Sequence, residues 1–295
     1  MSKPPAVRLL TPEDLPEALE LSCLAGWNQN LDDWRMLLEL APEGCYGIEM
    51  GGKIVATTTL LCYPNPLATC PGENAALDSS SLAWLGMVLT HPDYHRRGFA
   101  RTLLQHVLER ARSLAIRTVK LDATDAGRPL YENFGFRAEQ PVERWVLHRE
   151  SRQDLAIPCG SHLSKSALDD ICQLDRNACG YDRKSLLQKL LTRSRAFAAE
   201  SGYLLTRPGR LWSYLGPCIA TNAVTAERLI TLPLQFSEGW CWDLLPRNES
   251  AVTIARKQGF IRHRQLLRMV LGDETPVAGE LVYAIAGFEL GYANS

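Results

Sequence analysis

The chain has no excess of charge of either sign, since its 295 residues include 32 basic and 33 acidic side chains. This balance argues against a polybasic surface for nucleic acid or for an anionic membrane. The sequence also has no apolar run long enough to cross a bilayer, and its first residues lack the apolar core of a signal peptide. We therefore expect a soluble, cytoplasmic protein with neither a nucleic-acid partner nor a membrane partner.

Metal-binding and disulfide patterns are lacking as well. The nine cysteines are scattered, no Cys-x-x-Cys occurs, and no cysteine stands at ligand spacing from a histidine. Cys62 and Cys70 flank a loop with prolines and are able to pair in principle, but reduced thiols are the rule in the cytoplasm. We expect no metal and no disulfide.

What the first half does contain is an alternation of strand and helix patterns. Two apolar runs, 45–50 and 53–63, are joined by a Gly-Gly turn, which indicates a β-hairpin. An apolar strand over 82–90 leads into a helix from Gly98 with apolar residues at three- and four-residue intervals. The other elements expected in this half are a strand over 7–10, helices over 12–23, 31–40 and 129–134, and strands over 118–123 and 142–148. Together they favour an α/β fold, with a central mixed β-sheet and helices on both faces.

A second domain is expected beyond a polar segment with proline and glycine at 150–165. The sequence after it looks like a worn copy of the first half. YENFGFR at 131–137 is similar to ARKQGFIR at 255–262, and aligning their Gly-Phe pairs puts Tyr131 opposite Ala255. A fold built twice is the simplest explanation. The elements expected in the copy are a helix pair over 165–193, strands over 203–206, 211–220 and 240–245, and helices after 222 and over 249–257.

The residues after the strand 82–90 combine basic and small side chains at the start of a helix. They are His95, Arg96, Arg97, Gly98, Phe99 and Ala100. A helix start exposes unpaired N–H groups and carries partial positive charge, so it favours an anion. A glycine lets the backbone turn and approach a phosphate closely. Read alone, the same residues also describe an ordinary exposed, basic helix start.

This pattern resembles the acyl-CoA-binding signature of the GNAT acetyltransferase superfamily, in which Arg or Gln, two residues, Gly, any residue, and Gly or Ala surround a pyrophosphate. His95 stands where the family usually has Arg or Gln. The resemblance implies that residues 95–100 bind the pyrophosphate of acetyl-CoA, mainly through backbone N–H groups. The preceding LGMVLTHP resembles the family's central strand, so a bulge is implied there, with backbone groups of Met87, Val88 and Leu89 offered to the pantetheine amides.

LDATDAGRPLYENFGF at 121–136 resembles the strand, loop, helix and Gly-Phe turn that complete the CoA site in this superfamily. The resemblance puts Tyr131 near the acyl-CoA sulfur, as the general acid that protonates the leaving thiolate. The other interpretation is a packed helix tyrosine with its hydroxyl at the surface. Residues 25–38 border the acceptor in the family, so Trp27 and Asn28 are implied to line its pocket. A turn cap suits Asn28 equally, and the core suits Trp27.

The second half resembles the degenerate GNAT-like domain that follows the catalytic one in a tandem subgroup. The residues that carry this likeness are LDRNACGYDRKSLLQKL (174–190), LGPCIATNAVTAERLI (215–230) and LPRNESAVTIARKQGF (245–260). No Arg-x-x-Gly-x-Ala follows GPCIA, and Ala255 replaces the tyrosine. We therefore expect a catalytic domain over 1–150 and, over 151–295, a degenerate domain without the pyrophosphate motif that closes one side of the acceptor pocket. The 64–81 loop is either a lid or an idle insertion.

The resemblance implies an N-acetyltransferase that moves the acetyl group of acetyl-CoA to a primary amine of a small-molecule acceptor by direct attack. The strand 82–90 has no carboxylate to take the amine's proton, and Asp122, His91 and an ordered water all remain open as the base. The alternative is a catalytically silent CoA-binding regulatory or scaffold protein. A nucleotide-binding protein would need a Walker-type Gly-Lys-Ser/Thr, which is missing.

Overall fold

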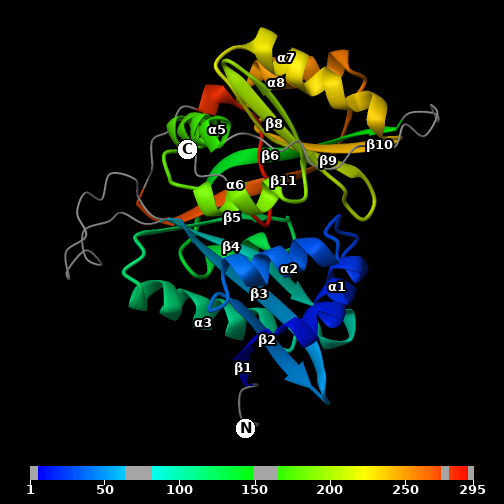
Figure 1. Ribbon diagram of the computed structural model, residues 1–295. Coiled ribbons are helices and arrows are strands. Elements are labelled where there is room, and N and C mark those ends of the chain that lie inside the picture. The colour runs from blue at the N-terminus through cyan, green and yellow to red at the C-terminus, as the bar shows by residue number, and fades with distance from the viewer. Residues whose placement is uncertain (1–5, 64–81, 149–164, 274–278, 292–295) are drawn as a thin grey trace. The chain divides into compact units, whose positions relative to one another are not determined.

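The computed structural model describes residues 6–63, 82–148, 165–273 and 279–291. The chain divides into two compact units, residues 1–121 and 122–295 (Figure 1). The loop 64–81, considered above as a lid, lies outside the described residues, as does nearly all of the segment where a domain boundary was expected.

The first unit contains a sheet in the order β1-β2-β3-β4-β5, in which β4 and β5 are parallel and the other neighbours antiparallel. Its strands are β1 (Val7–Leu9), β2 (Cys45–Met50), β3 (Lys53–Tyr63), β4 (Leu82–Thr90) and β5 (Thr118–Ala123), the last two residues of which belong to the second unit. Its helices are α1 (Leu15–Leu24), α2 (Leu31–Leu40) and α3 (Phe99–Ser113). The predicted hairpin is confirmed, since Gly51 and Gly52 turn between β2 and β3 with φ of 60° and 79°.

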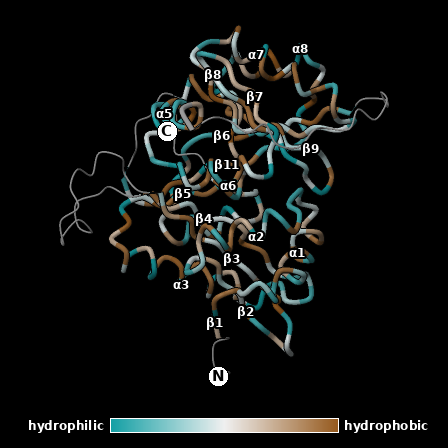
Figure 2. Tube along the Cα trace, viewed as in Figure 1, coloured by the Kyte–Doolittle hydropathy of each residue, from teal (hydrophilic) through white to brown (hydrophobic). Residues whose placement is uncertain are grey.

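Helix α3 turns one apolar face toward β3 and β4. Hydrophobic and hydrophilic residues alternate along its length (Figure 2). Its buried side chains are Phe99, Leu103, Leu104, Val107, Leu108 and Ala111. Burial of each large apolar side chain in this face stabilises the fold by about 1.5–3 kcal/mol. The apolar spacing that allows this burial is the pattern that predicted the helix, and the prediction is confirmed.

Strand β4 has the bulge that the family resemblance implies. Thr57 pairs with Leu89 and Thr59 with Gly86, so β4 has one more residue than β3 between these two pairs. Met87 lies inside the bulge with φ of 50°, a left-handed conformation that is rare for residues other than glycine. The Thr57 hydroxyl donates to the Met87 carbonyl at 2.9 Å and helps to hold this shape.

The pairing of β4 with β5 covers only the beginning of β4. It starts at Leu82 opposite Thr118 and ends at Trp84 opposite Lys120. The remaining residues of β4, 85–90, extend past the paired stretch and contain the bulge. The pairing of the two parallel strands therefore stops before their carboxyl ends, and β4 continues without it to the turn that leads to α3.

The second unit contains a sheet in the order β11-β6-β10-β9-β8-β7, and β12 pairs with β9. Its strands are β6 (Arg137–His148), β7 (Arg195–Ala199), β8 (Gly202–Arg207), β9 (Ser213–Ala220), β10 (Gly239–Leu244), β11 (Ile261–Gly272) and β12 (Val282–Ala284). Its helices are α4 (Arg128–Glu132), α5 (Lys165–Cys179), α6 (Lys184–Leu191), α7 (Ala223–Thr231) and α8 (Glu249–Lys257). A core with Trp145, Trp240 and Trp242 packs between the sheet and the residues of α7 and α8.

The predicted repeat is present as two copies of one strand–helix–strand motif, β5-α4-β6 and β10-α8-β11. Both helices end with a Gly-Phe pair, at 135–136 and 259–260, and the two glycines have φ of 87° and 85°. The N–H of each phenylalanine donates to the carbonyl five residues earlier, that of Tyr131 or of Ala255. Sequence positions in the two helix ends thus differ by 259 − 135 = 124.

The last strands of the two copies pair with each other about a local two-fold axis. Val142 of β6 lies opposite Leu266 of β11 in an antiparallel register, and 266 − 142 is again 124. A Cβ added to Gly135 would lie 3.5 Å from Leu271 of β11, and one added to Gly259 would lie 3.6 Å from Leu147 of β6. Each helix end therefore packs against the strand of the other copy.

Strand β6 explains why the division at 121/122 differs from the boundary expected near residue 150. It pairs with β10 on one side and with β11 on the other, both antiparallel. Both partners come from the second half of the sequence, so β6 is counted with them. The assignment of a catalytic domain to 1–150 and a degenerate domain to 151–295 stays a prediction.

The sequence patterns do not predict β7, β11 and β12, and β6 begins five residues before the expected 142. Strand β11 carries IRHRQLLRMVLG, in which basic side chains interrupt the apolar alternation. One of them, Arg268, is fully buried because it forms an ion pair with Asp122. A hydrophobic pattern alone gives no sign of a strand that buries charge.

Candidate functional site

Helix α3 begins without a side-chain cap. Its N-cap is Gly98, with φ of 83° and no side chain to accept a hydrogen bond. The first helical hydrogen bond runs from the N–H of Thr102 to the Gly98 carbonyl at 2.9 Å, so the N–H groups of Phe99 and Ala100 have no acceptor within the helix. A Cβ on Gly98 would meet nothing within 4 Å, so the positive φ, not crowding, calls for glycine. The helix start has the N–H groups and the positive dipole end that an anion site needs.

The three basic residues before this helix are exposed, and each has a definite local arrangement. Arg96 has φ of 60°, and the Arg97 guanidinium lies 4.9 Å from the centre of the Tyr94 ring. His95 Nε2 is 2.8 Å from the Thr90 carbonyl oxygen, so this ring is engaged at the end of β4. The structure thus has residues 95–98 in a short turn that leads directly into α3, with Arg96 and Arg97 as its exposed charges.

The three strand residues expected to meet pantetheine lie in and after the bulge of β4. The Met87 and Leu89 side chains are buried and the Val88 side chain is half-buried. Burial of the Met87 and Leu89 side chains leaves the backbone of these two residues as the part that a ligand is able to meet. Their role in binding stays a prediction.

Tyr131 lies on α4 in the second unit, where it is only 8% exposed. Its ring meets Phe136 edge-on, with the ring centres 5.9 Å apart. A Cβ on Gly127 would be 3.1 Å from the Tyr131 ring, so glycine makes room for it. The hydroxyl has no hydrogen-bond partner among the described residues, and burial raises the pKa of Tyr131 above its ordinary value. This phenol is therefore protonated at neutral pH and able to donate.

Asp122, one of the candidate bases, is engaged in a buried ion pair. Its two carboxylate oxygens accept from Nε and a terminal nitrogen of Arg268, at 2.8 and 2.9 Å. Neither side chain has any exposed surface. A carboxylate held in this way cannot accept an amine proton without breaking the pair, so the geometry favours a structural role. His91, the other candidate, caps a short turn by accepting from the Asp93 N–H at 3.3 Å.

The same ion pair occurs a second time, in the other copy of the repeat. Arg144 of β6 donates to both oxygens of Asp243 of β10, at 2.6 and 2.5 Å, and both side chains are buried. Arg268 lies 124 residues after Arg144, and Asp243 takes the same place in β10 that Asp122 takes in β5. Each pair joins a strand of one copy to a strand of the other. Sequence analysis missed this pairing, although the shared Asp near the end of β5 and β10 was a usable signal.

The corresponding helix start in the second unit is closed by a side chain. Asn222 is the N-cap of α7, and its side-chain oxygen accepts from the Thr225 N–H at 2.9 Å. An asparagine in this place satisfies one of the N–H groups that an anion would otherwise use. The sequence predicts this difference between the two helix starts, since residues 95–100 include a glycine and TNAV at 221–224 does not.

The gap between the parallel strands β9 and β10 is occupied by the chain itself. Their pairing ends at Leu215 opposite Trp242. Beyond it, β12 pairs with Cys218 and Ile219 of β9, and the N–H of Ile285 donates to the carbonyl of Asp243 at 3.0 Å. The C-terminal segment thus fills the space that the diverging strands leave.

The two sheets can be aligned at the last paired residue of the first strand, Trp84 in β4 and Leu215 in β9. The offset is 215 − 84 = 131, which puts Met87 and Val88 opposite Cys218 and Ile219. These last two residues are the ones that β12 binds. In the second unit a peptide backbone therefore occupies the positions at which the family resemblance expects pantetheine in the first.

The two residues expected at the acceptor pocket lie between α1 and α2. Trp27 is half-buried and Asn28 is 5% exposed. The cap of α2 is Asn30, not Asn28, since the Asn30 side chain accepts from the Asp33 N–H at 3.0 Å while the Asp33 carboxylate accepts from the Asn30 N–H. The turn-cap alternative for Asn28 is therefore not what this helix uses, and an acceptor-binding role stays a prediction.

Among the residues that the structure describes, no group of three or more His, Cys, Asp or Glu side chains is placed to hold a metal ion. None of the described helices is both long and apolar enough to span a membrane.

Two family models match the chain, one in each half. The acetyltransferase (GNAT) family matches residues 12–136, and an acetyltransferase (GNAT) domain matches residues 171–284. The uncharacterized N-acetyltransferase YitH of Bacillus subtilis (strain 168) is 28% identical over 164 residues. That match covers 51% of this chain and 55% of the relative's length.

Several solved structures share the fold over most of the chain. A crystal structure from Pyrococcus horikoshii, described as a candidate acetyltransferase, has a TM-score of 0.81 at 20% identity and covers 99% of this chain and 97% of its own. A tandem GNAT protein from the clavulanic acid biosynthesis pathway has a TM-score of 0.61 at 16% identity, over 90% of this chain and 98% of its own. A GCN5-related N-acetyltransferase from Kribbella flavida has a TM-score of 0.54 at 16% identity, over 90% and 71%. These likenesses show the fold, including its tandem form.

Proposed function

The chain belongs to the GNAT family of acetyltransferases as a tandem member, and on this premise we propose that it transfers an acetyl group from acetyl-CoA to a primary amine of a small molecule. The observation that carries the proposal is the start of α3, where a left-handed Gly98 leaves helix N–H groups without acceptors. A pyrophosphate is the anion that such a start suits in this family.

The residues of the first unit fit acetyl-CoA as a substrate. Gly98 leaves open space around its Cα, and Arg96 and Arg97 add exposed positive charge beside it. The bulge at Met87 turns backbone groups of β4 away from regular pairing, which makes them available to amides of an extended ligand. We assign pyrophosphate binding to residues 95–100, and amide binding to Met87, Val88 and Leu89.

Tyr131 supplies the acid in this proposal. Attack of the amine on the thioester expels a thiolate, whose negative charge develops on sulfur as the carbon–sulfur bond breaks. A phenol kept protonated by burial donates its hydrogen to that sulfur, while a backbone N–H of the strand polarises the carbonyl. The acceptor's proton leaves to water in this proposal, since Asp122 is engaged with Arg268 and His91 caps a short turn. Trp27 and Asn28 are proposed to line the acceptor pocket.

Replacing Tyr131 by phenylalanine tests the assignment. We expect kcat to fall about 100-fold, the size of a lost general acid, while acetyl-CoA affinity stays nearly unchanged. The measurement is thiol release from acetyl-CoA over a panel of amines and amino acids, with acetyl-CoA affinity measured separately by calorimetry. A variant with the kcat of the natural protein would refute the role of Tyr131.

The pH profile provides a second readout of the same residue. Because burial raises the pKa of Tyr131 above the ordinary value of about 10, the phenol stays protonated up to at least that pH. We therefore expect no loss of kcat from this group between neutral pH and about pH 10. A descending limb below pH 10 that vanishes in Tyr131→Phe would show a lower pKa and contradict the buried acid.

A catalytically silent CoA-binding protein is the second candidate, and one observation favours it. The described part of β4 has no carboxylate, and the nearby Asp122 is engaged with Arg268. The same panel separates the two functions. Acetyl-CoA binding without thiol release under any acceptor would support the silent protein, and release that needs both an acceptor and Tyr131 would exclude it.

A further inference from the structure

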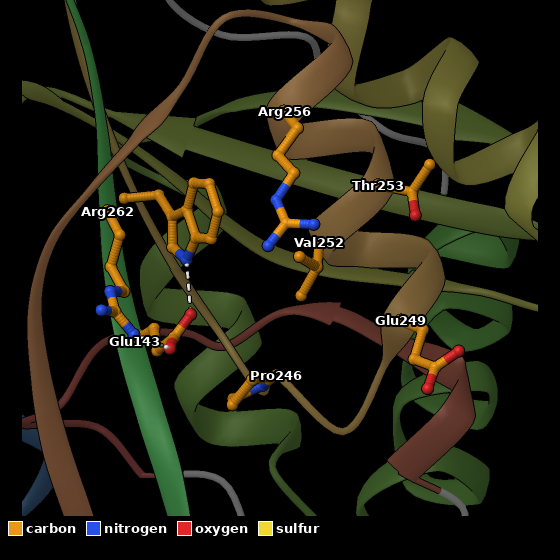
Figure 3. A pocket seen from close by; sticks show the side chains of 8 residues that line it. Glu143, Pro246, Glu249, Val252, Thr253, Arg256 and Arg262 are labelled. Carbon is orange, nitrogen blue, oxygen red and sulfur yellow. Dashed lines mark hydrogen bonds and ion pairs between the residues drawn. The ribbon is translucent and has the colours of Figure 1, made fainter.

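A cavity of about 650 Å³ lies in the second unit, between α8 and the strands β6 and β11 (Figure 3). Its volume is in the range of small-molecule sites. Arg256 reaches from α8 toward the strands, and Arg262 and Glu143 lie on the strand side (Figure 3). None of the residues that line the cavity has a role in acetyl transfer assigned to it above.

The strand side of the cavity is a fixed polar arrangement. One oxygen of Glu143 accepts from Arg262 at 3.0 Å, and the other accepts from the Trp145 indole N–H at 2.9 Å. Glu143 is only 7% exposed. Both of its oxygens are thus engaged, and its charge is compensated by Arg262. The bond to Glu143 also fixes the orientation of the Trp145 ring.

Arg256 is the cation in this cavity without a polar partner among the described residues, whereas Glu249, a carboxylate that also lines the cavity, lies in the first turn of α8, seven residues earlier. Its guanidinium lies 5.9 Å from the centre of the Trp145 ring and is exposed. It makes no hydrogen bond or ion pair with any described residue, so its N–H donors are available. The half-buried Val252 and Trp145, which belongs to the core and is 5% exposed, line the cavity beside it. A planar guanidinium fork next to an aromatic face suits a ligand with a carboxylate and a flat apolar part.

The repeat shows that the fold itself does not need these residues. With the offset of 124, Glu143 and Trp145 correspond to Leu267 and Met269, and Arg262 corresponds to Ala138. Arg256 corresponds to Glu132, which bears the opposite charge. The same strand–helix–strand motif therefore has three apolar residues and a glutamate at these places in one copy, and two guanidinium groups, a carboxylate and an indole in the other.

We propose that this cavity binds a small organic carboxylate with a flat apolar body. Its carboxylate pairs with Arg256, with Arg262 as a second donor, and its flat part lies against Trp145 and Val252. The observations that carry the proposal are the unpartnered guanidinium, the fixed indole and the absence of both from the equivalent place in the other copy. The site is a binding site, with no bond made or broken in it.

Benzoate, titrated into the full chain and followed by ligand-observed NMR, tests the proposal. We expect saturable binding with a Kd of about 1 mM or tighter, and a loss of about tenfold or more in Arg256→Gln, since a hydrogen bond to a charged group is removed. Arg247→Gln is the matched control, because Arg247 is an exposed arginine in the loop just before α8 that does not line the cavity. We expect the control to bind like the natural protein.

Three further arms decide between outcomes. Benzamide, which lacks the charge, should bind at least about tenfold more weakly than benzoate. Saturating acetyl-CoA should leave benzoate binding unchanged, which keeps this result independent of the proposed acetyl transfer. No saturable binding by the natural protein, or equal binding by Arg256→Gln, would overturn the proposal. Phenyl phosphate binding tighter than benzoate would overturn the carboxylate as its ligand class.

Discussion

Helices α3 and α7 each follow a strand that has a parallel neighbour, but their first N–H groups are satisfied in different ways. Helix α3 opens on Gly98 in a left-handed conformation, with N–H groups that have no acceptor within the helix. Helix α7 opens on Asn222, whose side chain accepts from the Thr225 N–H. One helix start is suited to an external anion, and the other is satisfied by its own side chain.

The strand edges beside these helices differ in the same way, because one lacks a partner and the other is paired with a segment of the chain. From Leu85 onward β4 has no pairing with β5, although it stays paired with β3, and the bulge at Met87 lies in this stretch. Between β9 and β10 the segment around β12 fills the equivalent stretch through hydrogen bonds with both strands. A repeated fold must satisfy its open backbone groups in each copy. The second unit does so with its own chain, and we infer that the first does so with a substrate.

The two reciprocal ion pairs offer the largest test of this comparison. Arg268→Met leaves the buried Asp122 without its cation, and Arg144→Met does the same to Asp243. Each change should lower the free energy of unfolding by about 3–5 kcal/mol, measured by urea unfolding. Similar losses are expected because the two pairs have the same geometry.

The activities of these two variants should differ. Asp122 precedes the loop and helix that carry the proposed acid Tyr131, whereas Asp243 precedes the helix with Ala255. Arg268→Met should therefore lower kcat at saturating acetyl-CoA, Arg268→Lys should recover part of it, and Arg144→Met should leave kcat nearly unchanged under conditions in which all three are folded. Equal losses of kcat would mean that the pairs act through stability alone.

Most of the fold could be predicted from the sequence, because its signals are local. The Gly-Gly turn, the stripe of α3 and the Gly-Phe helix ends each depend on residues within one element and its neighbours. Strand β11 was missed for the opposite reason. Its Arg268 is buried only because a carboxylate 146 residues away compensates it, and a window of sequence contains no trace of that partner.

The local features of the candidate site were predictable from the sequence, whereas its tertiary contacts were not predicted. The bulge of β4 and the glycine start of α3 are as expected, since both follow from the sequence next to them. The arginine partner of Asp122 was not predicted, although the Asp shared by β5 and β10 was a signal for it, and the segment around β12 that pairs beside β9 was not predicted either. Both depend on tertiary pairing, which the sequence pattern of either partner does not specify.

Variants of Gly98 test whether the start of α3 binds acetyl-CoA, and we expect their effect to be smaller than that of breaking an ion pair. Valine in a left-handed conformation costs about 1–3 kcal/mol, so Gly98→Val should weaken acetyl-CoA binding by about tenfold or more. Gly98→Asn is the matched control, because asparagine tolerates this conformation and a Cβ there meets nothing within 4 Å.

Calorimetry should also find one acetyl-CoA per chain. Two per chain would show that the filled gap of the second unit still binds, and equal affinities for the two variants would show that the turn at Gly98 is not what binds.

The smallest expected effect is at the other helix start. Asn222→Ala removes the cap of α7 and should lower the free energy of unfolding by about 1 kcal/mol, while Asn222→Ser, which keeps an acceptor, should lose less. Acetyl-CoA affinity should not change in either variant, because the side chain satisfies its own helix and no ligand. A fall in acetyl-CoA affinity with unchanged stability would reverse the assignment, since it would make the capped start a binding site. A fall in stability alone would show that the N–H groups at the start of α7 are satisfied by a side chain. It would then differ from the start of α3, whose N–H groups we infer to be satisfied by a substrate.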